Sequence, residues 1–390
     1  MTDNPRQSKR PYMAFVALLV LLFIGVICVP GLYFAGAISI ETVNMLGRYL
    51  TFAIVAVGLD LVWGYAGILS LCQAFFFCLG GYAMGMYLAH HGGPEGIVDA
   101  NGWKMPACLY VVYPGGAGQT EAEWTVPFFW KPFWSLPVTV LLALLIPGLV
   151  ALVIGFFGFR SRVRGVYFAI LTQAITVAAF NFFSMNNMKF CGTNGLTRFD
   201  RIAGSFQLSE PNVKLALYVV TVLALAAVYW GCHGLIKSRL GRVLVAIRDD
   251  ENTLRFSGYK PYVYKLFAFV LAGMIAGLAG MLYVPQMGII TPFDMEAGKS
   301  IMIVIWVAVG GRGTLAGAVL GALVVNLLYN YFTSQHDLGL LTWKADYWPF
   351  VLGGLFIGVV LWIKGGLMGL PSQLMRLIKG SGTGTASNEN

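Results

Sequence analysis

Charged residues are scarce in this sequence. Its 390 residues include 26 Lys and Arg and 17 Asp and Glu, which together make up 11% of the chain. Soluble globular domains average about 25% charged residues. The shortage excludes an ordinary soluble domain. Together with a hydrophobic content of 58%, it indicates a chain that crosses a membrane many times.

Patterns for catalysis or metal binding are also missing. The six cysteines show no CxxC pair, and His90, His91 and Cys108 lack regular ligand spacing. The stretch Glu296 to Ser300 resembles the end of a phosphate-binding loop, but Phe293 stands where that motif needs its first glycine. There is no nucleophile–base pair. We therefore predict no cofactor, no metal and no enzymatic activity in this chain.

Long apolar runs are what the sequence has instead. Each is long enough to cross a bilayer, which takes about 20 residues. A cleaved signal peptide is the alternative for the first run, but its removal would leave an odd number of crossings. We predict an all-α polytopic membrane protein of about ten transmembrane helices with Gly-rich interruptions and both termini on one side. The runs begin near Met13, Leu46, Gly67, Leu136, Gly165, Leu215, Leu266, Ser300, Leu315 and Trp348.

The distribution of charge predicts the orientation. With the N-terminus inside, the cytoplasmic segments carry 17 of the 26 basic residues and 5 of the 17 acidic ones. Basic residues concentrate on the cytoplasmic side of membrane proteins. Both termini are therefore expected in the cytoplasm of a bacterial inner membrane. The net charge of +9 follows from this topology and needs no nucleic-acid partner.

This topology divides the chain into three parts. Residues 1–12 form a cytoplasmic tail, 13–365 the transmembrane domain and 366–390 an interfacial or disordered cytoplasmic tail. The transmembrane domain contains a periplasmic loop at 90–135 and a polar cytoplasmic segment at 237–265. Cys108 and Cys191 both fall outside, and the sequence leaves open whether they pair.

The segment from Lys237 to Lys265 is the most polar part of the transmembrane domain, with ten charged residues. Apolar residues at helical spacing predict an amphipathic helix, and Gly258 predicts its end. A solvated connector with a lipid-facing stripe is the alternative. The apolar stripe is Leu244, Ile247, Leu254 and Phe256, and the polar face carries Arg242, Arg248, Asp249, Asp250 and Glu251.

Several polar residues lie inside apolar runs, where an amide must find a partner. Asp60 is the only carboxylate in a span, which is thin support for a proton relay. Glycines interrupt the chain at Gly64–Gly67 and Gly310–Gly313, and their similar placement weakly suggests an internal repeat. The candidates for lining a path for a small polar solute are Gln73, Phe75, Tyr82, Tyr167, Thr172, Gln173 and Trp306. Hydrogen bonding between helices is the alternative role for the two amides.

Motifs in a fixed order resemble ABC-importer permeases of the branched-chain amino acid and urea type. They are GRVLVAIRD at 241–249 with FSGY at 256–259, SLCQAFF at 70–76, LTQA at 171–174, GTNGL at 192–196, LYVPQ at 282–286 and WVAVGGRGT at 306–314. Branched-chain amino acid permeases usually carry Gly-His where this chain has Cys72-Gln73. That difference favours the urea branch, and in particular its C subunit.

The resemblance implies a permease subunit that moves urea with ATP hydrolysed by partner subunits. It implies a second related permease, two ATP-binding cassette subunits and a periplasmic urea-binding protein. In this family the polar segment docks onto the ATPase, which assigns coupling to Arg242, Arg248, Asp249, Asp250, Glu251 and Gly258. The alternatives are a branched-chain amino acid importer and, in a different class, a passive urea channel or ion-coupled carrier.

Overall fold

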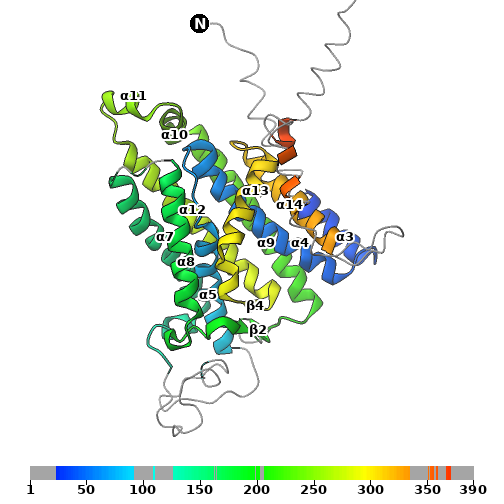
Figure 1. Cartoon of the computed structure of the whole chain (residues 1–390). Coiled ribbons are helices and arrows are strands. Elements are labelled where there is room, and N and C mark those ends of the chain that lie inside the picture. The colour runs from blue at the N-terminus through cyan, green and yellow to red at the C-terminus, as the bar shows by residue number, and fades with distance from the viewer. Residues whose placement is uncertain are drawn as a thin grey trace, which may run out of the picture.

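The structure is a computed structural model, and it describes most of the predicted transmembrane domain. The described residues are 23–91, 109, 126–161, 163, 165–197, 199–202, 206–333, 350, 352–354, 357–358 and 366–369. In this part of the chain long helices form one bundle, and the strands are only two residues each (Figure 1). The all-α prediction is confirmed.

The described helices range from single short turns to long spans. In chain order they are η1 (Phe23–Cys28), α3 (Val29–Phe34), α4 (Ile40–Asp60), η2 (Leu61–Tyr65), α5 (Gln73–His91), η4 (Lys131–Trp134), α7 (Leu136–Arg160), α8 (Val166–Ser184), η5 (Asn186–Met188), η6 (Gly192–Asn194), α9 (Pro211–Lys237), α10 (Arg239–Asp249), α11 (Glu251–Phe256), α12 (Pro261–Met287), η7 (Pro292–Met295), α13 (Ala297–Gly310), α14 (Leu315–Thr333) and η9 (Leu367–Gly369). The strands β1 (Leu196–Thr197) and β4 (Ile289–Ile290) pair antiparallel, as do β2 (Arg201–Ile202) and β3 (Phe206–Gln207).

Six of the described helices are long and apolar enough to cross a membrane. They are Ile40–Tyr65, Leu136–Arg160, Val166–Ser184, Pro211–Lys237, Pro261–Met287 and Leu315–Thr333. The segments Ile24–Phe34 and Ala297–Gly310 are apolar but shorter, while α5 is buried almost throughout. Much of the first and last predicted spans lies outside the described residues, so the number ten stays a prediction.

Small residues bring the central helices into close contact. A Cβ added to Gly80 of α5 would lie 2.0 Å from the carbonyl oxygen of Gly277 in α12. Ala272, Ala276 and Ala279 on α12 are fully buried. The small residues noted in the sequence thus let helix backbones approach closely. On the outside, α7 and α8 expose apolar side chains such as Leu149 and Ile170, as lipid-facing helices do.

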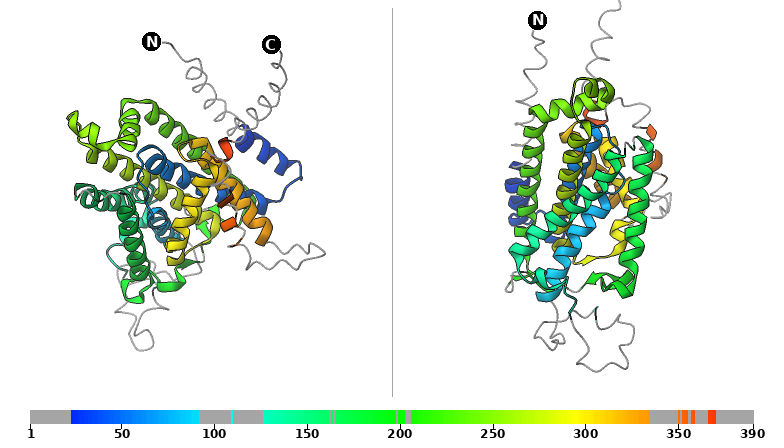
Figure 2. Two further views of the ribbon diagram at one scale, coloured as in Figure 1. Left: turned by 45° about the horizontal axis from the view of Figure 1, so that its top comes forward. Right: turned by 90° about the vertical axis from the view of Figure 1, so that its left-hand side faces the viewer.

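The bundle has two structurally different ends. Figures 1 and 2 show α10 and α11 projecting at one end and the short strands at the opposite end. Cys191, near the strands, is disulfide-bonded, and four cysteines are free: Cys28, Cys72, Cys78 and Cys232. The sixth, Cys108, lies outside the described residues, as does most of the predicted periplasmic loop.

Candidate functional site

The polar segment forms two helices instead of the single amphipathic helix expected. Asp250 has extended backbone (φ −153°, ψ 101°) between α10 and α11. Its Oδ1 accepts hydrogen bonds from the backbone N–H groups of Asn252 at 2.9 Å and Thr253 at 3.4 Å. An Asp that caps a new helix stabilises a break in the old one. We call residues 239–258, which turn through this break, the coupling corner.

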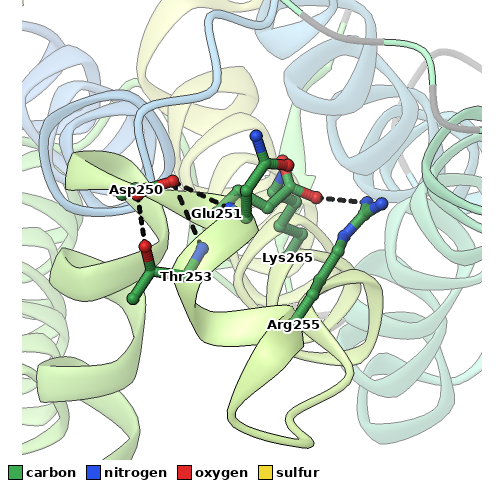
Figure 3. A network of polar contacts seen from close by, with 6 residues as sticks. Asp250, Glu251, Thr253, Arg255 and Lys265 are labelled. Carbon is green, nitrogen blue, oxygen red and sulfur yellow. Dashed lines mark hydrogen bonds and ion pairs between the residues drawn. The ribbon is translucent and has the colours of Figure 1, made fainter.

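The cap of α11 is drawn in Figure 3. The Thr253 hydroxyl also donates a hydrogen bond to the Asp250 carboxylate. This side-chain bond, followed by the two backbone bonds, holds the pKa of Asp250 below its ordinary value. Asp250 therefore stays ionised at neutral pH and serves the local structure of the coupling corner.

Glu251 fastens the coupling corner to the bundle. Its two carboxylate oxygens accept from Arg255 at 2.6 Å and from Lys265, on α12, at 2.7 Å (Figure 3). The side chains of Glu251 and Lys265 are only 14% and 13% exposed. Partly buried charges of this kind need their partners. Glu251 thus holds α11 against α12.

The apolar stripe predicted along this segment is buried only in α10. Leu244 and Ile247 are 1% and 4% exposed, whereas Phe256 at the end of α11 is 92% exposed. Leu254 on α11 is half-buried, so the stripe loses its cover along α11 and leaves Phe256 projecting at its end. An aromatic residue beside a helix-ending Ser-Gly pair was the sequence signal for an exposed tip.

Gly258 ends the coupling corner as the sequence predicted. It has φ +83°, and no atom lies within 4 Å of the position of an added Cβ. A positive φ favours glycine for conformational reasons alone. On α10, Arg242 is exposed.

Arg248 points toward the membrane part of the protein. Its Nη1 donates to the carbonyl oxygen of Gly64 at 2.8 Å, and its Nε lies 3.2 Å from Asp249 Oδ1. Its side chain also covers Gly67, where an added Cβ would lie 2.8 Å from Arg248 Cγ. Arg248 therefore connects α10 to the interruption that follows α4.

The two Gly-rich interruptions found in the sequence meet at this point. The backbone N–H of Gly313 donates to Asp60 Oδ1 at 2.7 Å. Arg312 donates to the Trp63 carbonyl oxygen at 2.9 and 3.1 Å, and its guanidinium lies 4.9 Å from the Trp63 ring. Asp60 Oδ1 thus accepts from the backbone of the second interruption, while its Oδ2 is buried without a hydrogen-bond partner among the described residues. The sequence placed the interruptions similarly but did not predict their contact.

Gln73 and Tyr82 carry buried polar atoms without partners among the described residues. Gln73, the first residue of α5, is fully buried, and neither atom of its amide is hydrogen-bonded. The Tyr82 hydroxyl is likewise unpartnered, and its ring lies 4.9 Å from Phe183. Unsatisfied buried groups call for an explanation, and an absent ligand or water is one.

The other path candidates lie in different surroundings. Thr172 donates to the Ala169 carbonyl and accepts from Leu71 N–H at 3.0 Å, which pins the segment before α5 to α8. Tyr167 is 78% exposed on the outer surface of α8. Gln173 is half-buried with an unpartnered Oε1, and Phe75 is buried in the core. Of the seven candidates, only Trp306 lines the cavity described next.

That cavity, which we call the outer cavity, has a volume of about 650 Å³ and lies among α4, α5, α12, α13 and α14. It is lined by the early turns of α4, the last turn of α12 and the first turns of α13, which places it toward the strand-bearing end. Its wall carries an aromatic cluster: Phe52 lies 5.1 Å from Trp306 and 5.4 Å from Tyr283. Arg48, Asp294 and Asn326 add polar groups that the sequence reasoning did not select.

Comparison with known proteins identifies the family. A family model described as "Branched-chain amino acid transport system / permease component" matches residues 41–360. The chain belongs to this family. The high-affinity branched-chain amino acid transport system permease protein LivM of Escherichia coli K12 is 24% identical over 94% of this chain and 78% of its own length.

Other permeases match smaller parts of the chain. The autoinducer 2 import system permease protein LsrC of Salmonella paratyphi B is 30% identical over 58% of this chain and 63% of its own length. The ribose import permease protein RbsC of Escherichia coli K12 is 28% identical over 35% of this chain and 43% of its own length. No solved structure matches. The chain is therefore a multi-pass permease subunit of an ABC-type importer.

Proposed function

We propose that this permease passes urea across the bacterial inner membrane, driven by ATP that partner subunits hydrolyse. The complete importer contains a second related permease, two ATP-binding cassette subunits and a periplasmic urea-binding protein. The family match over residues 41–360 supports the transport role. The motif resemblance, including Cys72-Gln73, supports the urea branch.

The main support for docking onto the ATPase is the exposed tip of the coupling corner, at Phe256. Phe256 is 92% exposed in a segment otherwise rich in charge, and large aromatic anchors surrounded by polar residues are typical of protein interfaces. The tip is held in place by the Glu251 ion pairs and by the Asp250 cap. A rigid projection can transmit a displacement of the ATPase to the permease. The hydrogen bond from Arg248 to Gly64 connects α10 directly to the membrane part of the chain.

The disulfide at Cys191 supports the predicted orientation. Disulfides form in oxidising compartments such as the bacterial periplasm. Cys191 precedes η6 and β1, at the strand-bearing end, and α10 and α11 of the coupling corner lie at the opposite end (Figure 1). The outer cavity is then periplasmic in access, and the coupling corner faces the cytoplasm where ATP is hydrolysed.

The interior suits a neutral polar solute. Urea offers four N–H donors and one carbonyl acceptor. Gln73, Tyr82 and Trp306 hold unpartnered donors and acceptors near aromatic surfaces, as sites for small ligands often do. The match to LivM over 94% of the chain favours a second candidate cargo, a branched-chain amino acid.

Uptake into vesicles tests the proposal. The permease is reconstituted with its partner subunits, and uptake of labelled urea and of labelled leucine is measured with and without ATP. The variant Phe256→Ser should lower ATP-dependent uptake at least tenfold, because truncating an interface anchor costs about 2 kcal/mol or more. Phe128→Ser is the matched control, since Phe128 is 83% exposed but precedes α7 at the other end.

The outcomes separate the possible failures. ATP-dependent uptake of leucine but not of urea would show that the permease is an importer with an amino acid as its substrate. Equal uptake of urea with and without ATP would contradict an ATP-driven importer and support a channel. Normal coupling in Phe256→Ser, at normal assembly with the ATPase, would remove the coupling corner from the docking surface.

A further inference from the structure

Arg48 is an unusual residue for its position. It lies in the third turn of α4, inside a candidate membrane span, and lines the outer cavity. Among the described residues its Nε is buried without a hydrogen-bond partner, and its Nη1 donates to the thioether sulfur of Met287 at 3.0 Å. No ion pair of Arg48 occurs in the described part of the chain. An arginine inside a span marks a functional site unless it is paired.

A second unpartnered donor lines the same cavity. Trp306 is 6% exposed, and its Nε1 has no acceptor among the described residues. Buried indole N–H groups usually find a partner. Two donors from different helices, α4 and α13, thus lack acceptors at one cavity. The acceptor that would satisfy them is an oxygen atom of a bound solute.

Acceptors also line this cavity. Asp294 is held by the capping box of η7, where its Oδ2 accepts from the Thr291 N–H at 3.1 Å and from its hydroxyl at 3.4 Å. Its Oδ1 accepts no hydrogen bond from the described residues. Glu296 lies at the same end of α13 and is exposed. The cavity therefore offers carboxylates to N–H donors, and the Arg48 guanidinium and the Lys299 ammonium to an oxygen.

We propose that the outer cavity is the site where the permease receives its solute, and that Arg48 donates to the solute's carbonyl or carboxylate oxygen. The N–H groups of the solute then face Asp294, and its apolar or planar part packs on Phe52 and Tyr283. This inference rests on the proposed transport function and names the chemistry that its entry site selects. The class is a small solute with an oxygen acceptor and N–H donors, which both urea and an amino acid fit.

The substitution Arg48→Met tests the donor. Losing a charged hydrogen-bond donor should raise the KM for uptake by about ten- to hundredfold, at an unchanged amount of assembled complex. Arg48→Gln distinguishes a solute that is bound through a carbonyl oxygen from one that is bound through a carboxylate. It keeps N–H donors, so a carbonyl solute should lose about threefold or less, whereas a carboxylate solute should lose as much as with Arg48→Met.

Lys214→Met is the matched control. Lys214 is another cation at this end of the bundle, but it pairs with Glu41 at 2.6 Å and does not line the cavity. Its removal should leave the KM within twofold. A KM within twofold of wild type in Arg48→Met would overturn the proposal. Wild-type complex that takes up neither solute would instead overturn the proposed function.

A labelling experiment tests the cavity without ATP or transport. Met45 lines the cavity, so Met45→Cys in a Cys28→Ser background should react with a small thiosulfonate reagent. Saturating urea or leucine should slow this reaction at least threefold. Glu41→Cys, at the start of the same helix and outside the cavity, should react at a rate that neither solute changes. Unprotected Met45→Cys would overturn the assignment even if Arg48→Met failed to assemble.

Discussion

The cations at the two ends of this permease differ in how they are paired. At the coupling corner the cations Arg248, Arg255 and Lys265 all bind an acceptor of the protein itself. At the outer cavity, Arg48 Nε and Trp306 Nε1 bind none among the described residues. Polar groups satisfied internally rigidify a structure, whereas unsatisfied ones suit a ligand. The difference supports the proposed division between a rigid coupling corner and a solute-binding outer cavity.

The satisfied end also reaches into the membrane part of the chain. Arg248 binds Gly64, and a few ångströms away Gly313 binds Asp60. These bonds involve backbone atoms at helix interruptions, where the chain has free donors and acceptors to offer. A displacement of α10 is therefore felt at both interruptions together.

The largest expected effect concerns which end faces which compartment. Phe128 and Phe256 are 83% and 92% exposed and lie at opposite ends. We predict that Phe128→Cys reacts with an impermeant thiol reagent only from the periplasmic side and Phe256→Cys only from the cytoplasmic side. Reactivity is measured in intact cells and in inverted vesicles.

The control for this experiment is a Cys28→Ser background, since the other free cysteines among the described residues, Cys72, Cys78 and Cys232, are buried. The reverse pattern of labelling would show that the orientation in the membrane is opposite to the one predicted. The outer cavity would then be an exit, and the corner could not meet a cytoplasmic ATPase.

A smaller effect compares two glutamates that bind lysine at similar distances. Glu251 is 14% exposed and binds Lys265 at 2.7 Å, whereas Glu41 is 70% exposed and binds Lys214 at 2.6 Å. Removing Glu251 leaves partly buried cations without a partner. We predict that Glu251→Gln lowers the free energy of unfolding by about 1–3 kcal/mol, and Glu41→Gln by at most about 1 kcal/mol.

Thermal unfolding of the purified permease in detergent measures this difference. Glu251→Gln should also reduce ATP-dependent uptake, because α11 is no longer fixed to α12. Equal melting temperatures for the two variants would show that the coupling corner does not depend on its ion pairs for rigidity.

The sequence predicted the fold class well because its signals are local. Apolar runs, small residues on α12 and Gly258 at the end of α11 each act within a few turns of helix. The break at Asp250 was missed although the signal was present, because Asp250-Glu251-Asn252-Thr253 also fits a continuous polar face. Capping competes with helix continuation, and the sequence alone did not show which one tertiary packing favoured.

The candidate site was harder to predict because it depends on distant pairs. Arg48 lies near the beginning of an apolar run, and the sequence alone indicates an interfacial charge. Its place in a cavity depends on α12 and α13, which are distant in the sequence. Thr172 reads as a path residue until Leu71 is found against it, 101 positions away along the chain. A list of polar residues inside spans does not say which of them are satisfied by other helices.

The smallest expected effect concerns the Asp250 cap of α11, in the coupling corner. Hydrogen bonds from Thr253 and Asn252 hold the pKa of Asp250 below its ordinary value of 3.8. A lowered pKa means that the contribution of the ionised carboxylate is fully present above the ordinary pKa and is lost as pH falls through the lower folded value. Hydrogen exchange at the amides of Asn252 and Thr253, corrected for intrinsic rates, should therefore show constant protection from pH 7 to pH 4, about the ordinary Asp pKa.

Asp250→Ala should remove this protection at every pH, while Asp249→Ala, which removes the neighbouring carboxylate that takes no part in the cap, should leave it intact. Protection that declines already between pH 6 and pH 5 would show that the carboxylate is not held ionised by the cap. The coupling corner would then share the unsatisfied character of the outer cavity.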